Sequence, residues 1–106
     1  MRKCDRFIFE GFLPPKKGRK KRLSALEQES ATIIFFENPK RMKRTLNDIL
    51  ENIGNRPAVV CRELTKLYEE IIRGTVEELL AYFSKHDVKG ECVLLIGKDD
   101  KNVHFN

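Results

Sequence analysis

Apolar positions along the chain fall into short continuous runs and into longer stripes with a helical period. Aromatic, branched or other apolar residues dominate four segments typical of strands: 6–12, 31–36, 57–61 and 92–96. A fifth segment, 69–73, is more polar, which favours a strand at the edge of a sheet. The run 31–36 is apolar apart from one threonine, a pattern typical of a strand buried on both faces.

Helical patterns fill the gaps between these segments. The clearest is an apolar stripe at a 3.6-residue period: Met42, Leu46, Ile49, Leu50 and Ile53. Asn38 is predicted to cap this helix, Pro39 to open it and Gly54 to end it. A second helix is predicted after a T-x-x-E capping box at Thr75 and Glu78, and residues 19–29 form a third with a thin apolar face. This alternation predicts an α/β fold: a mixed sheet of about five strands with flanking helices.

Length and composition narrow the class of protein. The 106 residues are enough for one domain, predicted over 1–97, with a polar tail at 98–106. No apolar run approaches the roughly 18 residues of a membrane span, and no signal-peptide pattern follows the N-terminus. Three widely spaced cysteines fit reduced thiols, and His86 and His104 lack ligand-spaced partners. We therefore expect a cytoplasmic protein with no metal and no membrane partner.

Positive charge is concentrated at one end of the chain. The net charge is +5, yet residues 1–22 carry nine basic and two acidic residues, and the rest sums to −2. Clustered cations attract a polyanion by releasing its counterions, so the sequence favours nucleic-acid binding, against the alternative of a solvated loop or helix face. The predicted RNA contacts are the cations of two clusters: Lys16, Lys17, Arg19, Lys20, Lys21, Arg22, Lys40 and Arg41.

Chemistry in such a sheet is expected outside the carboxyl ends of its strands. Residues 36–41 and 61–70 follow two of the predicted strands, whereas no glycine-rich phosphate loop or nucleophile elbow is present. Asn38–Pro39 is either an anion site at a helix N-terminus or simply a helix start. Arg62, Glu63 and Lys66 are either functional or a surface ion-pair set. Composition and spacing alone thus predict a basic α/β module that binds RNA.

Four segments carry a more specific resemblance: EGFLPPKKGRKKR (10–22), FFENPKR (35–41), RELTKLYEEIIRGT (62–75) and GECVLLIG (90–97). In this order they resemble the C-terminal half of the small-subunit ribosomal RNA methyltransferase I family, a branch of the tetrapyrrole methylase superfamily. The family pattern at the second segment is nearer YESPHR. Asn38 and Lys40 stand here in place of its serine and histidine, which keeps the helix start and removes the histidine.

The resemblance implies methyl transfer from S-adenosylmethionine to the ribose 2′-hydroxyl of a cytidine in 16S ribosomal RNA. It also implies two α/β domains with the cofactor in the cleft between them, and a homodimer. The N-terminal domain with its glycine-rich cofactor loop is not part of this chain. We therefore expect the chain to need that domain, as well as the small ribosomal subunit or its RNA, and not to catalyse unaided.

The same resemblance assigns roles to individual residues. The cofactor-binding positions it implies are Phe36, Glu37, Arg62, Leu64, Glu91 and Cys92. Glu63 or Lys66 would activate the hydroxyl as a base or a polarising cation. Two alternatives stay open: a free-standing RNA-binding module without catalysis, and a methylase of this superfamily whose substrate is a small tetrapyrrole.

Overall fold

The computed structural model describes residues 6–62 and 69–98 as five strands and three helices. Their bounds are β1 Phe7–Gly11, α1 Arg19–Leu26, β2 Thr32–Glu37, α2 Pro39–Asn52, β3 Pro57–Arg62, β4 Glu70–Thr75, α3 Val76–Lys85 and β5 Cys92–Ile96. Each predicted strand and helix is present, with bounds that differ by at most three residues. The predicted domain limit at residue 97 is not tested, because the tail beyond Lys98 lies outside the described residues.

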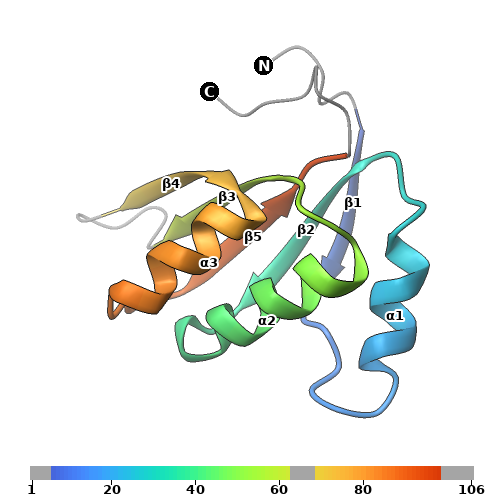
Figure 1. The fold of residues 1–106 in the computed structure, drawn as a ribbon, viewed down its shortest axis with the longest axis horizontal. Coiled ribbons are helices and arrows are strands. Elements are labelled where there is room, and N and C mark those ends of the chain that lie inside the picture. Colours follow the sequence, from blue (N-terminus) through green and yellow to red (C-terminus); the bar gives the residue numbers. More distant parts are fainter. Residues whose placement is uncertain (1–5, 63–68, 99–106) are drawn as a thin grey trace.

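The strands form one sheet in the order β1-β2-β5-β3-β4 (Figure 1). Strands β1 and β2 pair in parallel, whereas β5 lies antiparallel between β2 and β3, and β4 pairs antiparallel with β3 at the outer edge. The sheet is therefore mixed, and the more polar β4 is an edge strand, as the sequence predicts. Since β1, β2 and β3 run in one direction, their carboxyl ends lie together along one edge of the sheet. This edge runs across the strand ends and is not the side where β4 lies.

Local capping explains where two of the helices begin. The Asn38 side chain accepts a hydrogen bond from the Lys40 amide at 2.9 Å, and Pro39 opens α2. At α3 the capping box is complete, because Thr75 accepts from the Glu78 amide while Glu78 accepts from the Thr75 amide. Helix α1 ends at Leu26 and not at the predicted residue 29, since the Glu27 amide already bonds Ser24 in a tighter turn.

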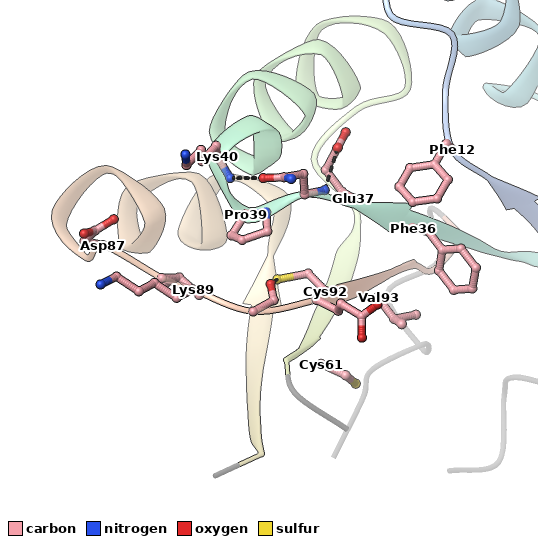
Figure 2. Close-up of a pocket in the computed structure, with 14 residues that line it drawn as sticks. Phe12, Phe36, Glu37, Pro39, Lys40, Cys61, Asp87, Lys89, Cys92 and Val93 are labelled. Atoms are coloured by element: carbon pink, nitrogen blue, oxygen red, sulfur yellow. Dashed lines mark hydrogen bonds between the residues drawn. The ribbon is translucent and has the colours of Figure 1, made fainter. Parts of the chain in front are cut away.

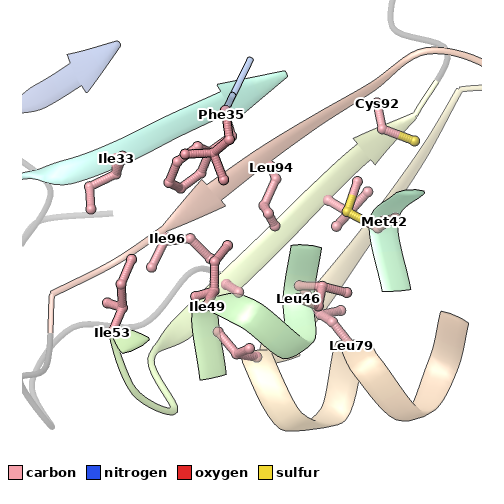
Figure 3. Close-up of a cluster of buried hydrophobic side chains, with 14 of the residues drawn as sticks. Ile33, Phe35, Met42, Leu46, Ile49, Ile53, Leu79, Cys92, Leu94 and Ile96 are labelled. Carbon is pink, nitrogen blue, oxygen red and sulfur yellow. The ribbon is translucent and has the colours of Figure 1, made fainter. Parts of the chain in front are cut away.

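The hydrophobic core lies between the sheet and helices α2 and α3, which cross one face of it (Figures 1 and 3). Phe35 and Leu94 from the central strands meet Met42, Leu46 and Ile49 from the apolar stripe of α2. All five side chains are fully buried. Helix α1 lies beside α2 at the β1 edge and adds Leu23 and Leu26.

The opposite face of the sheet carries no helix of the described residues. Along β2, Ile33 and Phe35 are buried, whereas Ile34 is half-buried and Phe36 is 36% exposed. The expectation that 31–36 is buried on both faces is therefore wrong. Ile34 and Phe36 belong instead to an open apolar face that also includes Phe7 and Phe9.

Within the described ranges, no helix is long and apolar enough to cross a membrane. A search of the same ranges finds no cluster of three histidine, cysteine, aspartate or glutamate side chains that could hold a metal ion.

Candidate functional site

Strand register brings the predicted site residues into one row. Glu37 at the end of β2 lies opposite Cys92 at the start of β5, and Cys92 lies opposite Arg62 at the end of β3. One position along, Phe36, Val93 and Cys61 form a second row. Residues 37, 62 and 92, far apart in the sequence, thus meet at the edge where ligands of α/β sheets gather.

A pocket of about 900 Å³ opens at this edge (Figure 2). It is lined by Phe12, by residues 36–40 at the β2–α2 junction, by Cys61 and by residues 87–93 before and within β5. The volume is in the range of pockets that enclose a drug-sized ligand. Of the predicted cofactor residues, Phe36, Glu37, Glu91 and Cys92 line it, whereas Arg62 does not.

The Glu37 carboxylate faces the interior. This side chain is 7% exposed; one oxygen accepts from the Asn38 amide at 2.7 Å and the other from the Thr45 hydroxyl at 2.5 Å. Both carboxylate oxygens are thus hydrogen-bonded within the protein. Its carboxylate fixes the turn from β2 into α2.

Arg62 does not line the pocket. It holds in place the Lys89–Gly90 segment, which does line it. Its Nε and Nη2 donate to Glu70 Oε1 at 3.0 and 2.9 Å, and its Nη1 donates to the Lys89 carbonyl at 2.8 Å. The Tyr82 hydroxyl donates to the other Glu70 oxygen at 3.1 Å. Desolvation and the adjacent Glu70 carboxylate raise the pKa of Tyr82, which keeps the phenol protonated as a donor. Arg62 is therefore a positioning residue for the Lys89–Gly90 segment.

Replacing Arg62 by methionine should lower the free energy of unfolding by about 1–2 kcal/mol, because the Lys89 carbonyl loses this donor and Glu70 Oε1 loses two, while the Tyr82 bond to Glu70 remains. Amide hydrogen exchange at residues 87–91 should become faster than in the wild type. Arg73→Met on the exposed face of neighbouring β4 is the matched control. Equal exchange at 87–91 in both variants would contradict the positioning role.

The two pocket cysteines differ in their surroundings. Cys92 is buried and its thiol donates to the Gly90 carbonyl over 3.6 Å. Cys61 is half-buried, and burial raises the pKa of its thiol. The Cys61 thiol is therefore a poor thiolate nucleophile at neutral pH, and this side of the pocket is better suited to binding and orienting a ligand than to covalent catalysis.

Asn38–Pro39 was predicted to be either an anion site or a helix start, and its hydrogen bonds are those of a helix start. The Asn38 side chain occupies the Lys40 amide, and the Asn38 carbonyl accepts from the Arg41 amide. The helix start thus serves α2 itself. The Lys40 side chain is exposed, and Lys40 lines the pocket. Positive charge at this place therefore comes from the Lys40 ammonium group and not from the start of the helix.

The basic segment, residues 12–22, runs from the end of β1 into the first turn of α1 and is held to α2 and β1. Arg44 donates to the Pro15 carbonyl at 2.8 Å, and Arg22 pairs with Glu10 at 2.9 Å. Lys16, Lys17, Lys20 and Lys21 remain exposed. Because β1 and β2 are parallel, this segment leaves the sheet at the same edge as the pocket (Figure 1).

Arg19, one of the predicted RNA contacts, is buried in the structure. It is 8% exposed, and its guanidinium donates to Asp48 at 2.8 Å, to Thr45 at 2.8 Å and to the Pro14 carbonyl at 3.1 Å. Every guanidinium nitrogen has a protein partner. Arg19 therefore fixes the basic segment to α2 and is not available to a phosphate.

Three predicted residues, Glu63, Leu64 and Lys66, lie outside the described residues. Phe12 and residues 87–90 line the pocket and were not predicted from the sequence. Phe12 was assigned to the first strand, but that strand ends at Gly11, whose φ is 72°. Residues 87–89 have no periodicity, and their one signal is the glycine of the GECV motif that follows.

Comparisons with known proteins give further findings. A family model described as Tetrapyrrole (Corrin/Porphyrin) Methylases matches residues 1–80. A protein of Thermotoga maritima named ribosomal RNA small subunit methyltransferase I is 48% identical over 96 residues, which is 90% of this chain and 43% of that protein. A Bacillus subtilis protein of the same name is 44% identical over 99 residues, 92% of this chain and 34% of its own length. The chain thus spans about a third to two fifths of these relatives.

Solved structures show the same architecture. A cobalt precorrin-4 methyltransferase of cobalamin biosynthesis matches with a TM-score of 0.66 and 23% identity, over 87% of this chain and 40% of that one. Uroporphyrin III C-methyl transferase from Thermus thermophilus matches with a TM-score of 0.63 and 13% identity, over 96% and 46% of the two chains. At these identities the likeness establishes the fold alone, and the predicted mixed α/β fold is confirmed.

Proposed function

Because the chain belongs to the tetrapyrrole (corrin/porphyrin) methylase family, we propose that its pocket forms one wall of an S-adenosylmethionine site. The reaction we propose is methyl transfer to the ribose 2′-hydroxyl of a cytidine in 16S ribosomal RNA. The opposite wall would come from a region that the relatives carry outside the matched span. Relatives named ribosomal RNA small subunit methyltransferase I support this choice of substrate.

The pocket residues fit the chemical groups of this cofactor. Val88 and Val93 offer apolar surface for an adenine ring, while Asp87 and Glu91 offer carboxylates for hydroxyl groups. Lys89 lies on the same wall and offers a cation for a carboxylate. When bound, S-adenosylmethionine supplies an electrophilic methyl group on a sulfonium. The work of this chain is then to hold and orient the ligand, a task of proximity and not of covalent catalysis.

The position of the exposed cations carries the proposal for an RNA substrate. Lys16 and Lys17 follow β1 at the edge where the pocket opens, Lys20 and Lys21 lie in the first turn of α1, and Lys40 and Arg41 begin α2. Phosphate contacts at this place would position RNA beside the pocket without reading its sequence. A tetrapyrrole, smaller than an RNA loop, would leave most of these cations without a partner.

The proton of the 2′-hydroxyl must leave as the new oxygen–carbon bond forms, so a base is needed. Glu63 and Lys66, which follow β3 directly in the sequence, stay our predicted candidates. Arg62, one residue earlier, is engaged with Glu70 and Lys89. Glu63→Gln and Lys66→Met in the complete gene product would test them separately, and near-normal turnover in both would remove them from the mechanism.

The decisive assay gives the complete gene product methyl-labelled S-adenosylmethionine and either small ribosomal subunits or tetrapyrrole precursors. Labelled 2′-O-methylcytidine in the digested 16S RNA is the expected product. Label in the tetrapyrrole would favour the small-molecule alternative. Tight RNA binding without any methyl transfer would favour a non-catalytic RNA-binding module.

A further inference from the structure

Three phenyl rings form an exposed cluster at the rim of the pocket. Phe9 is 63% exposed, Phe12 is 68% exposed and Phe36 is 36% exposed. The Phe36 ring lies 5.1 Å from the Phe9 ring and 5.6 Å from the Phe12 ring between centroids, in edge-to-face geometry (Figure 2 shows Phe12 and Phe36). Contiguous exposed aromatic surface of this kind marks an interaction site.

Exposed cations lie near the cluster on two elements, and the pocket that Phe12 and Phe36 line also holds the carboxylates of Asp87 and Glu91. Phe12 precedes the exposed Lys16 and Lys17 by four and five residues, and it shares the lining of the pocket with Lys40. The two carboxylates next to these rings in sequence are engaged: Glu10 pairs with Arg22 at 2.9 Å, and Glu37 is buried and hydrogen-bonded. Exposed rings beside unpaired ammonium groups suit a ligand that carries both flat bases and phosphates.

We infer that Phe12 and Phe9 stack on bases of the RNA substrate at the mouth of the pocket, with Phe36 supporting both rings. This inference rests on the proposed function and names the residues that hold the nucleotides next to the methylated one. Aromatic platforms flanked by cations are how proteins bind single-stranded nucleic acid, because every base has a face to stack on. The nearby lysines would hold the phosphates that connect the stacked bases.

The alternative to RNA is a protein partner that packs against these rings. Lysine is depleted at the centre of protein–protein interfaces, whereas exposed lysines flank this cluster on the loop side and across the pocket. The same open face continues to Phe7 at the far end of β1, away from the pocket. Phe7 is 54% exposed and so provides a matched control on the same strand and face.

The test measures binding of the complete gene product to a fluorescent 12-nucleotide oligocytidylate and to an abasic strand of equal charge. Phe12→Leu, which keeps apolar bulk but removes the flat face, should weaken oligocytidylate binding about 10-fold, and Phe9→Leu should do the same. Phe12→Trp should retain wild-type affinity, and Phe7→Leu should stay within 2-fold of it. Binding of the abasic strand should be the same in all variants.

Phe12→Trp also provides a direct signal, because this chain has no tryptophan. Its indole fluorescence should be quenched by oligocytidylate and not by the abasic strand. The inference is overturned if Phe12→Leu binds oligocytidylate like the wild type. A change in oligomeric state of Phe12→Leu by sedimentation, with unchanged RNA affinity, would assign the rings to a protein partner instead. If the wild-type protein transferred no methyl group to ribosomal RNA, the proposed function would be overturned. If it did, and both leucine variants bound oligocytidylate like the wild type, only the stacking would be overturned.

Discussion

Replacing Arg19 by methionine should lower the free energy of unfolding by about 2–3 kcal/mol, because its buried guanidinium makes a charge-assisted hydrogen bond to the half-buried Asp48 and two further hydrogen bonds. Asp48 would lose its 2.8 Å partner, and Thr45 and the Pro14 carbonyl would lose a donor each. Thr45 in turn donates to Glu37, so the loss extends to the turn that shapes the pocket. Urea unfolding followed by circular dichroism measures the change.

The matched control is Lys20→Met, one residue along α1, where the side chain is exposed. Its expected change is within about 0.5 kcal/mol, as is usual for a surface substitution. If Arg19→Met destabilised the chain no more than this control, Arg19 would belong with the exposed cations after all.

Replacing Lys16, Lys17, Lys20 and Lys21 together by alanine should weaken RNA binding about 100-fold at 0.15 M salt. Each phosphate contact to a single strand contributes roughly 0.7 to the slope of log affinity against log salt, so four contacts account for about 3. The loss should be equal for oligocytidylate and oligouridylate, because phosphate contacts carry no sequence information. Fluorescence anisotropy across a salt series measures both the affinity and the slope.

Arg73→Ala with Lys85→Ala is the control, since both side chains are exposed and belong to β4 and α3. This pair should leave the slope unchanged. A quadruple lysine variant with the wild-type salt slope would remove the basic segment from the RNA-binding surface.

Local signals made much of the fold predictable. The apolar stripe from Met42 to Ile53 and the Asn38 cap locate α2, and Thr75 with Glu78 locates the start of α3. These features are encoded within one or two turns of a helix, so each can be read without knowing the tertiary structure. The more polar composition of 69–73 likewise identified the edge strand β4.

Features that depend on distant contacts were not predictable. The insertion of β5 between β2 and β3 joins residues 30 or more positions apart, and this pairing brings Cys92 between Glu37 and Arg62. Arg19 stands in a run of cations, and nothing in the run distinguishes the one that Asp48 and Thr45 bury. An apolar strand reads the same whether its second face is covered or open, which is why the exposure of Phe36 was missed.

The pocket at the ends of β2 and β3 is proposed to be one wall of the cofactor site, and the other proposals depend on this. Hydrogen exchange measured by mass spectrometry, on the complete gene product with and without saturating S-adenosylhomocysteine, tests this directly. Residues 36–40 and 87–93 should be protected, while residues 54–56 at the opposite edge of the sheet should exchange unchanged. Ligand binding demonstrated by calorimetry, with neither 36–40 nor 87–93 protected, would contradict the account.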